Sequence, residues 1–247
     1  MIFSHSIAGE AWGNTLMNAK KTEESLRVPC YPLYSILAAL GNPVIDYMSL
    51  DVEGVEMKVI KVSTVLKNIP WDDVKIRVIT IEIFLLPEGP EALRTFMEEK
   101  GFKFIKQLNQ DYLFINKQLS GGGLERPSSR QPERVLIYYL DNPRQKFYSQ
   151  HGQYKHVKEI FRDMKRGSFF EVGALTGESL SNTLYLEREL GWTGVLMEPT
   201  PVSYHVLKSK NRRAHIMRAC LAPDTSYREP VSEFVIHART SRRCTRF

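Results

Sequence analysis

Hydrophobic and polar positions in the first half of the chain alternate with the periods of strands and helices. The apolar run Val44-Ile-Asp-Tyr-Met-Ser-Leu50 predicts a buried strand, and Pro90 opens a stretch with the apolar spacing of a helix. The pattern predicts a helix at 32–40, strands at 44–50 and 76–84, a helix at 90–99, and an antiparallel hairpin formed by 102–108 and 112–116.

The second half contains a strand over residues 169–172, then the loop Gly173-Ala-Leu-Thr-Gly177, which opens a helix, and a second strand that ends at Glu198. Strand, glycine loop, helix and strand make half of a nucleotide-binding α/β unit. The pattern around this unit predicts helices at 153–165 and 202–209 and a third strand at 214–220.

The residue types of this unit predict a nucleoside site. Gly173 and Gly177 lack a Cβ, so the backbone can turn tightly and a ligand can approach the amides at the helix start. Glu198 ends the next strand, where a carboxylate can accept hydrogen bonds from both ribose hydroxyls.

The loop also favours one class of cofactor over another. It lacks the G-x-G-x-x-G spacing that brings the backbone against a dinucleotide pyrophosphate. The acid before it, Glu171, suits a ligand with an ammonium group, such as the methionine end of S-adenosylmethionine. We therefore expect a methyl donor rather than NAD.

Two further carboxylates follow the strand at 44–50. Asp51 and Glu53 lie at its carboxyl end, where open α/β sheets bind their ligands. Both are candidates for the acceptor side of a reaction, and both are equally suited to cap the helix that follows. His205 and His215 are weaker candidates for a base, because lone histidines on a helix or strand are more often surface or core residues.

The second half resembles a known family. Ser149-Gln-His-Gly152 and the later run FFEVGALTGESLSNTLYLERELGWTGVLMEP are similar to the opening half of the FkbM methyltransferases, in particular the Star-like subgroup. The resemblance implies a class I methyltransferase-like (Rossmann-like) sheet and O-methylation dependent on S-adenosyl-L-methionine. The cofactor-binding residues expected from it and from the residue types are Glu171, Gly173, Ala174, Gly177 and Glu198.

The chain departs from the family pattern at two points. Thr176 stands where the family often has an acid, and Gln153-Tyr154 replaces a Glu-Asp pair. Both changes remove negative charge near the expected cofactor end. They bear on whether the chain is catalytically active.

The first half resembles the closing half of the same family. VPCYPLYSILAALGNPVIDYMSLDVEGVEMKVIK, IPWDDVKIRVITIEI and DYLFINK are similar to its later strands, so the halves stand in reversed order. The expected organisation is a poorly ordered N-terminus at 1–27, the closing half at 28–117, a flexible linker at 118–134, the opening half at 135–223, and a basic tail at 224–247.

The reversed order has two interpretations. The chain is either a circular permutant, in which the linker joins the old ends, or a slice from a tandem array, and in both cases its strands can close into one compact α/β sheet. A slice would have a neighbouring domain or a second copy of the chain as its partner, since an unpaired sheet edge would otherwise be exposed.

Composition limits which partners and which cellular compartment are expected for the chain. The net charge of +6 is concentrated near Lys208 to Arg213 and in the last residues, without interleaved aromatics, which argues against specific nucleic-acid binding. No apolar run approaches the roughly 18 residues of a membrane span, and no leader pattern is visible. Three cysteines provide no metal motif, and Cys30 and Cys220 are expected as free core thiols in a reducing, cytoplasmic setting.

Two functions follow. The first is methyl transfer from S-adenosylmethionine to a small-molecule or glycan hydroxyl, with Asp51 and Glu53 as the catalytic candidates. The second is a non-catalytic, Star-like role in secretory or endosomal vesicle trafficking. The second would place the protein at the endoplasmic reticulum, Golgi or endosomes if a membrane span precedes this chain.

Overall fold

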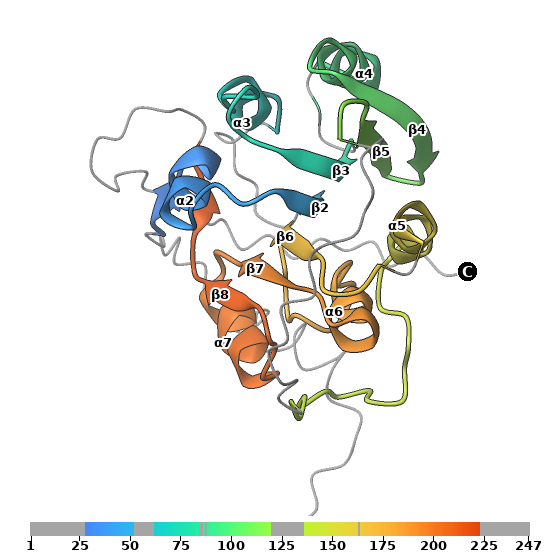
Figure 1. Cartoon of the computed structure of the whole chain (residues 1–247). Coiled ribbons are helices and arrows are strands. Elements are labelled where there is room, and N and C mark those ends of the chain that lie inside the picture. Colours follow the sequence, from blue (N-terminus) through green and yellow to red (C-terminus); the bar gives the residue numbers. More distant parts are fainter. Residues whose placement is uncertain are drawn as a thin grey trace, which may run out of the picture.

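The computed structural model describes residues 28–51, 62–83, 86, 88–119, 136–162 and 164–222. These residues form a seven-stranded mixed sheet with helices on both faces, and a separate sheet of two short parallel strands (Figure 1). The seven strands follow the order β4-β5-β3-β2-β6-β7-β8. All neighbours in this sheet run parallel except at β5, which is antiparallel to both β3 and β4.

The two halves of the chain contribute their elements in blocks. Residues 28–117, the first segment, contain β1 (Cys30–Tyr31), α2 (Leu33–Ala39), β2 (Ile45–Leu50), α3 (Val62–Lys67), β3 (Ile76–Glu82), α4 (Pro90–Glu99), β4 (Phe102–Leu108) and β5 (Asp111–Asn116). Residues 136–222, the second segment, contain α5 (Gln153–Phe161), β6 (Ser168–Val172), α6 (Leu184–Leu190), β7 (Thr193–Met197), α7 (Pro201–Ser209), β8 (His215–Met217) and β9 (Cys220–Leu221).

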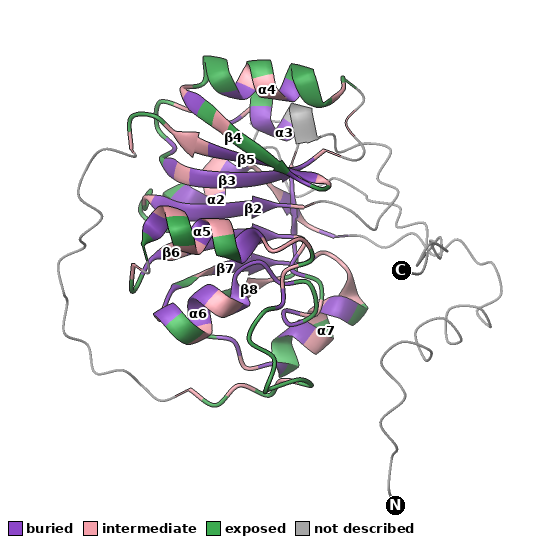
Figure 2. Ribbon diagram, turned by 90° about the vertical axis from the view of Figure 1, so that its right-hand side faces the viewer, coloured by how far each residue is buried: buried purple, intermediate pink, exposed green. Residues whose placement is uncertain are grey.

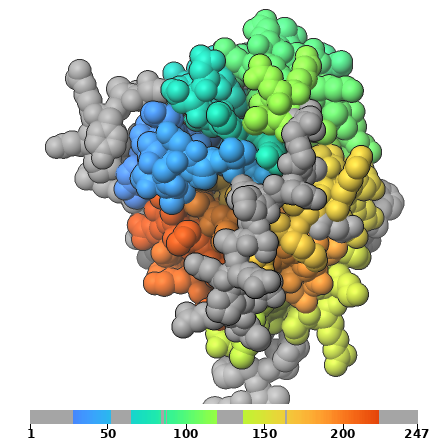
Figure 3. Space-filling view, in the orientation of Figure 1, coloured from blue at the N-terminus to red at the C-terminus, as the bar shows by residue number. Residues whose placement is uncertain are grey.

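The segments join at the centre of the sheet, where β2 lies parallel to β6. Their register runs from Tyr47 opposite Phe169 to Leu50 opposite Val172. The strands of the first segment lie on one side of this pair and those of the second segment on the other, and the two blocks meet along one seam (Figure 3). The expectation of a single sheet built from both halves is therefore confirmed.

Two hydrophobic clusters fill the space between the sheet and its helices. One contains buried residues of α2, α3 and α4, such as Leu37, Leu66 and Met97. The other contains residues of α5, α6 and α7, such as Val157 and Leu186. The central strands are buried on both faces, whereas α4 carries its exposed residues outward (Figure 2). This accounts for the nearly continuous apolar sequences of those strands.

Two elements of the second segment differ most from the prediction, and the helix predicted at 153–165 ends at Phe161. The helix expected directly after Gly177 begins only at Leu184, because polar residues at 181–183 turn inward and bond to Glu171. The third strand of the second segment is interrupted, and its final residues, β9, leave the main sheet to pair with β1.

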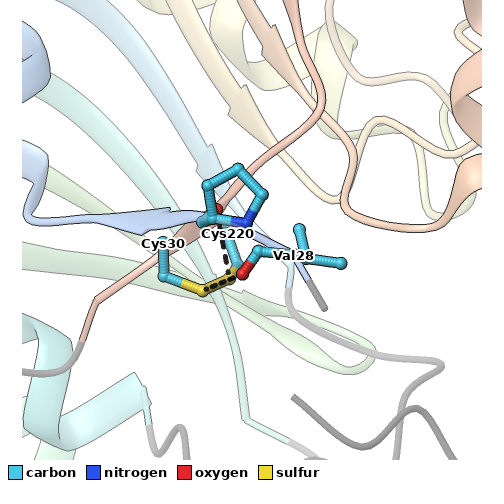
Figure 4. Close-up of a disulfide and its surroundings, with 4 residues drawn as sticks. Val28, Cys30 and Cys220 are labelled. Atoms are coloured by element: carbon cyan, nitrogen blue, oxygen red, sulfur yellow. Dashed lines mark hydrogen bonds between the residues drawn. A yellow bond between two sulfur atoms is a disulfide. The ribbon is translucent and has the colours of Figure 1, made fainter. Parts of the chain in front are cut away.

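The pairing of β1 with β9 corrects the prediction of free core thiols. Cys30 lies opposite Cys220 with a Cα–Cα distance of 4.4 Å, and the two side chains form a disulfide (Figure 4). Both residues are buried, as expected. A separation of 190 residues along the chain hid the partnership, which exists only after the two segments fold together. The cysteines therefore no longer indicate a reducing compartment.

The described residues contain no helix long and apolar enough to cross a membrane. Within the same residues, no three His, Cys, Asp or Glu side chains gather as a metal site would require.

Candidate functional site

The centre of the sheet is a topological switch point. From β2 the chain passes through α3 on one face to β3, whereas from β6 it passes through α6 on the opposite face to β7. Ligands of open α/β sheets bind beside the carboxyl ends of the strands at such a point. A ligand site is therefore expected at the loop after β6 and the residues after β2.

The strand registers place four acidic residues and one glycine of the predicted cofactor loop side by side along one edge of the sheet. Glu82 lies opposite Asp111, and Leu50 lies opposite both Ile81 and Val172, so Asp51 adjoins Glu82 on one side and Gly173 on the other. Val172 lies opposite Met197, which puts Glu198 next in line. Paired residues face the same side of a sheet. We call the set Asp111, Glu82, Asp51, Gly173 and Glu198 the edge row.

Gly173 is required by a contact between the two segments. Its φ is +82°, and a Cβ built there would lie 2.0 Å from the backbone oxygen of Asp51. The Asp51 amide in turn donates to the oxygen of Val172 at 3.1 Å. The sequence indicated a glycine that admits a ligand, but the atom that approaches it is the backbone of the other segment.

The loop amides do not form the predicted cradle for an anion. Those of Gly173 and Ala174 both donate to the oxygen of Met197 at 3.0 Å, and that of Gly177 donates to Ala174 at 2.8 Å. A Cβ at Gly177 would lie 2.2 Å from Leu207 Cδ1, so this glycine serves packing. The amides of both predicted glycines are therefore not open to a ligand, because the protein already uses them.

Glu198 combines burial with unused acceptor capacity. Its residue is 4% exposed, and one carboxylate oxygen accepts the Leu175 amide while the other accepts the Thr200 amide, each at 2.9 Å. The Thr200 hydroxyl is a third donor to this carboxylate, which offers about four lone-pair directions, so roughly one remains. Burial raises the pKa of Glu198 above its ordinary value, against the effect of these hydrogen bonds. One further hydroxyl donor would match what is left.

Two exposed apolar residues belong to the segments next to Glu198, namely the loop whose amide it accepts and the helix that follows it. Leu175 is 40% exposed and Val202, in the first turn of α7, is 55% exposed. Leu175 also has a positive φ of 50°, which a non-glycine side chain rarely adopts. Exposed apolar side chains and a strained backbone beside a buried acid are features of ligand sites.

Glu171 lies deeper, and its carboxylate faces into the protein. It accepts the Asn182 amide at 2.7 Å, the Ser181 hydroxyl at 3.1 Å and the Thr183 hydroxyl at 2.5 Å. Burial raises the pKa of Glu171, although the nearby Arg212 charge and these hydrogen bonds oppose the rise. Its observed role is to hold residues 181–183 against the sheet.

Two residues of the basic stretch at 208–213 are internal cations. Arg212 forms an ion pair with Glu187 at 3.1 Å and donates to Thr183 Oγ1 at 3.1 Å. Lys210 contacts Glu178 at 2.8 Å and Asp141 at 2.6 Å. Burial lowers the pKa of Lys210, but the hydrogen bonds to these two carboxylates outweigh it and raise the pKa. The charge pattern of the sequence could not distinguish buried cations from exposed ones.

The remaining candidates are distributed as follows. Asp51 is half-buried in the edge row, whereas Ala174 is buried in the core beneath the loop. His205 and His215 are exposed. Glu53 lies outside the described residues.

Sequence reasoning missed Ser49 and Asn182, which lie beside Glu171 in the fold. The polar run Ser181-Asn-Thr183 after the glycine loop was the only signal for them.

A separate cavity of about 500 Å³ lies between α5 and α6, over the stacked rings of Phe147 and Tyr154. Its lining contains no residue of the edge row.

Comparison with known proteins adds one finding. The family model described as the methyltransferase FkbM domain matches residues 2–104, a stretch that includes β2, β3 and Asp51 but ends before the Gly173 loop. No curated protein and no solved structure matches the chain. The mixed α/β sheet is consistent with a methyltransferase-like fold. The chain is thus similar to the FkbM methyltransferase domain over less than half of its length.

Proposed function

We propose that this protein binds S-adenosylmethionine at the edge row and transfers its methyl group to a hydroxyl acceptor. The observation that carries the proposal is the edge row itself, in which Glu198, Gly173 and Asp51 adjoin at a topological switch point. The match to the FkbM methyltransferase domain over residues 2–104 supports the same reaction class.

The residues present fit a nucleoside with an amino-acid end better than a dinucleotide. Four of the five loop amides, those of residues 173–175 and 177, already donate within the protein, which leaves little to hold a pyrophosphate. Glu198 retains acceptor capacity for a ribose hydroxyl, and the exposed side chains of Leu175 and Val202 would provide apolar surface for a base. S-adenosylmethionine would supply an electrophilic methyl group on its sulfonium.

Asp51 is the described residue best placed for the acceptor. It follows β2 and adjoins Gly173, so its carboxylate lies on the first-segment side of the same edge. A carboxylate there would receive the proton of the acceptor hydroxyl as the oxygen attacks, and positioning would supply most of the rate. Glu53 stays a candidate of the same kind, and sugar or small-molecule hydroxyls are the acceptor class.

The reversed order of segments fits this proposal in either interpretation. A circular permutant and a slice from a tandem array would both bring β2 beside β6, and both would need a carboxylate from each segment. The site is then shared between the segments, with Asp51 from one and Glu198 from the other.

Isothermal titration with S-adenosylmethionine tests the proposal. We expect binding by the wild type and a loss of about tenfold or more for Glu198→Ala, because a hydrogen bond to a charged acceptor would be lost. Glu99→Ala, an exposed acid on α4, is the control for removing one carboxylate. Asp51→Asn should slow methyl transfer without weakening cofactor binding. Absence of heat and of any thermal shift with the wild type would refute the proposal.

The disulfide favours a second candidate, the non-catalytic Star-like role in the secretory or endosomal system. Disulfides persist in oxidising compartments and are rare in the cytosol. Alkylating free thiols at the moment of cell lysis, followed by mass spectrometry, would report the native state of Cys30 and Cys220. Fully alkylated cysteines would contradict this candidate, while a bonded pair together with no binding of S-adenosylmethionine would favour it.

A further inference from the structure

One buried polar atom beneath the edge row has no partner among the described residues. Asn182 is 6% exposed; its backbone amide donates to Glu171 at 2.7 Å, and its side-chain Nδ2 donates to Ser49 Oγ at 2.9 Å. Its Oδ1 makes no hydrogen bond within the described part of the chain. Burying an amide oxygen without a partner is unfavourable, so such atoms call for an explanation.

Turning the amide over does not remove the problem. The Ser49 hydroxyl can either accept from Nδ2 or donate to Oδ1, so it pairs with one end of the amide and leaves the other end alone. The side chain cannot move away freely either, because Glu171 fixes its backbone. One end of the amide is therefore unpaired in either orientation, and in the orientation of the structure it is the acceptor Oδ1.

Asn182 sits directly below the centre of the edge row. Ser49 and Glu171 are register partners on β2 and β6, two residues before Asp51 and Gly173, on the same face of the sheet. The hydroxyl of Ser149, whose backbone bridges to Leu180, is a second buried polar atom without a partner in the described structure. Ser149 is thus brought by this bridge beside Leu180, the residue that precedes the segment held by Glu171.

We propose that Asn182 Oδ1 accepts a hydrogen bond from the ammonium group of the methyl donor, and that Glu171 is the positioning residue behind it. This rests on the proposed function and deepens it. An amide oxygen can only accept a hydrogen bond, so the unpaired Oδ1 disfavours an anionic group beside it and suits a donor such as an ammonium. Glu171, which the sequence assigned to the ammonium group, thus acts on the ligand only indirectly, by positioning Asn182.

Three ligands distinguish recognition of the ammonium group by Asn182 from a general effect of Asn182 on the site. S-adenosylmethionine carries the ammonium and a carboxylate, decarboxylated S-adenosylmethionine keeps the ammonium alone, and 5′-methylthioadenosine has neither. We expect Asn182→Ala to weaken binding of the first two by about 10- to 100-fold, as for a hydrogen bond to a charged group, and to leave the third within about twofold. Isothermal titration measures all three.

Two further variants separate a loss of ammonium binding from a general effect of substitution and from a failure to fold. Asn116→Ala, at the opposite end of the strands, should change none of the three affinities. Ser49→Ala keeps Asn182 but frees its amide, so it should reproduce the selective loss in weaker form even if Asn182→Ala does not fold. Equal weakening of all three ligands by Asn182→Ala would overturn the inference while the proposed function stands. A wild type that binds none of the three would overturn the proposed function itself.

Discussion

Gly173 shows how one missing side chain joins two distant parts of the chain. The backbone oxygen of Asp51 occupies the space that a Cβ would need, so the two segments approach each other there as closely as backbone allows. The sequence marked this glycine correctly as special. The reason differs, because the pattern of a single strand and loop contains no information about which strand becomes its neighbour.

Gly173→Ala should destabilise the fold by about 2 kcal/mol or more, since both the positive φ and the backbone contact oppose a side chain. Gly41→Ala is a matched control, because Gly41 has the same φ of +82° but a Cβ added there would meet no atom within 4 Å. The difference between the two variants in free energy of unfolding, measured with urea, isolates the effect of the contact with the Asp51 backbone oxygen. Equal destabilisation would show that Asp51 does not press on this position.

The segment between Gly173 and α6 is where sequence reasoning was least accurate. A glycine loop normally opens a helix at once, yet here ten residues intervene before Leu184. The cause is a tertiary interaction: Glu171 on β6 and Arg212 after α7 draw Ser181 and Thr183 inward. Helices with local signals, such as α4 with Pro90 at its start, were predicted to the residue.

The pH dependence of stability reports on this segment. Because burial raises the pKa of Glu171 above its ordinary 4.5, the folded protein takes up a proton at a pH where the unfolded chain stays ionised. The resulting stabilisation is complete below the ordinary pKa and is lost as the pH rises through the raised value. Lowering the pH from about 7 to about 5 should therefore increase the free energy of unfolding.

Glu171→Gln tests the assignment, because this variant should lose part of that increase. Urea unfolding at several pH values measures it, with Glu99→Gln as the control for the loss of one carboxylate. Identical pH profiles for wild type and Glu171→Gln would exclude Glu171 as the source. Glu198, whose pKa is also raised by burial, would then be the next group to replace.

Across the molecule, the sharing of one sheet by both segments was the most predictable feature, and the covalent link between the segments was the least. Apolar runs and the family resemblance predicted that β2 and β6 would share one sheet. Counting cysteines could not predict a bond between β1 and β9, because both strands have only two residues and carry almost no local signal.

Breaking that bond should lower the free energy of unfolding by about 2–5 kcal/mol, because the unfolded chain would regain the freedom that a long closed loop denies it. The double variant Cys30→Ala/Cys220→Ala and the reduced wild type should agree in urea unfolding, with Cys244→Ala as the control. Unchanged stability after reduction would indicate that the pair does not tie the segments together in solution.

The same disulfide also determines what happens when the backbone is cut. From Cys30 to Cys220 the polypeptide is a covalent ring, and almost every strand and helix described above lies on it. Hydrolysis of any one peptide bond in that ring opens it without releasing a fragment, so new termini could arise there and the sheet would still be a single molecule until a reductant arrives.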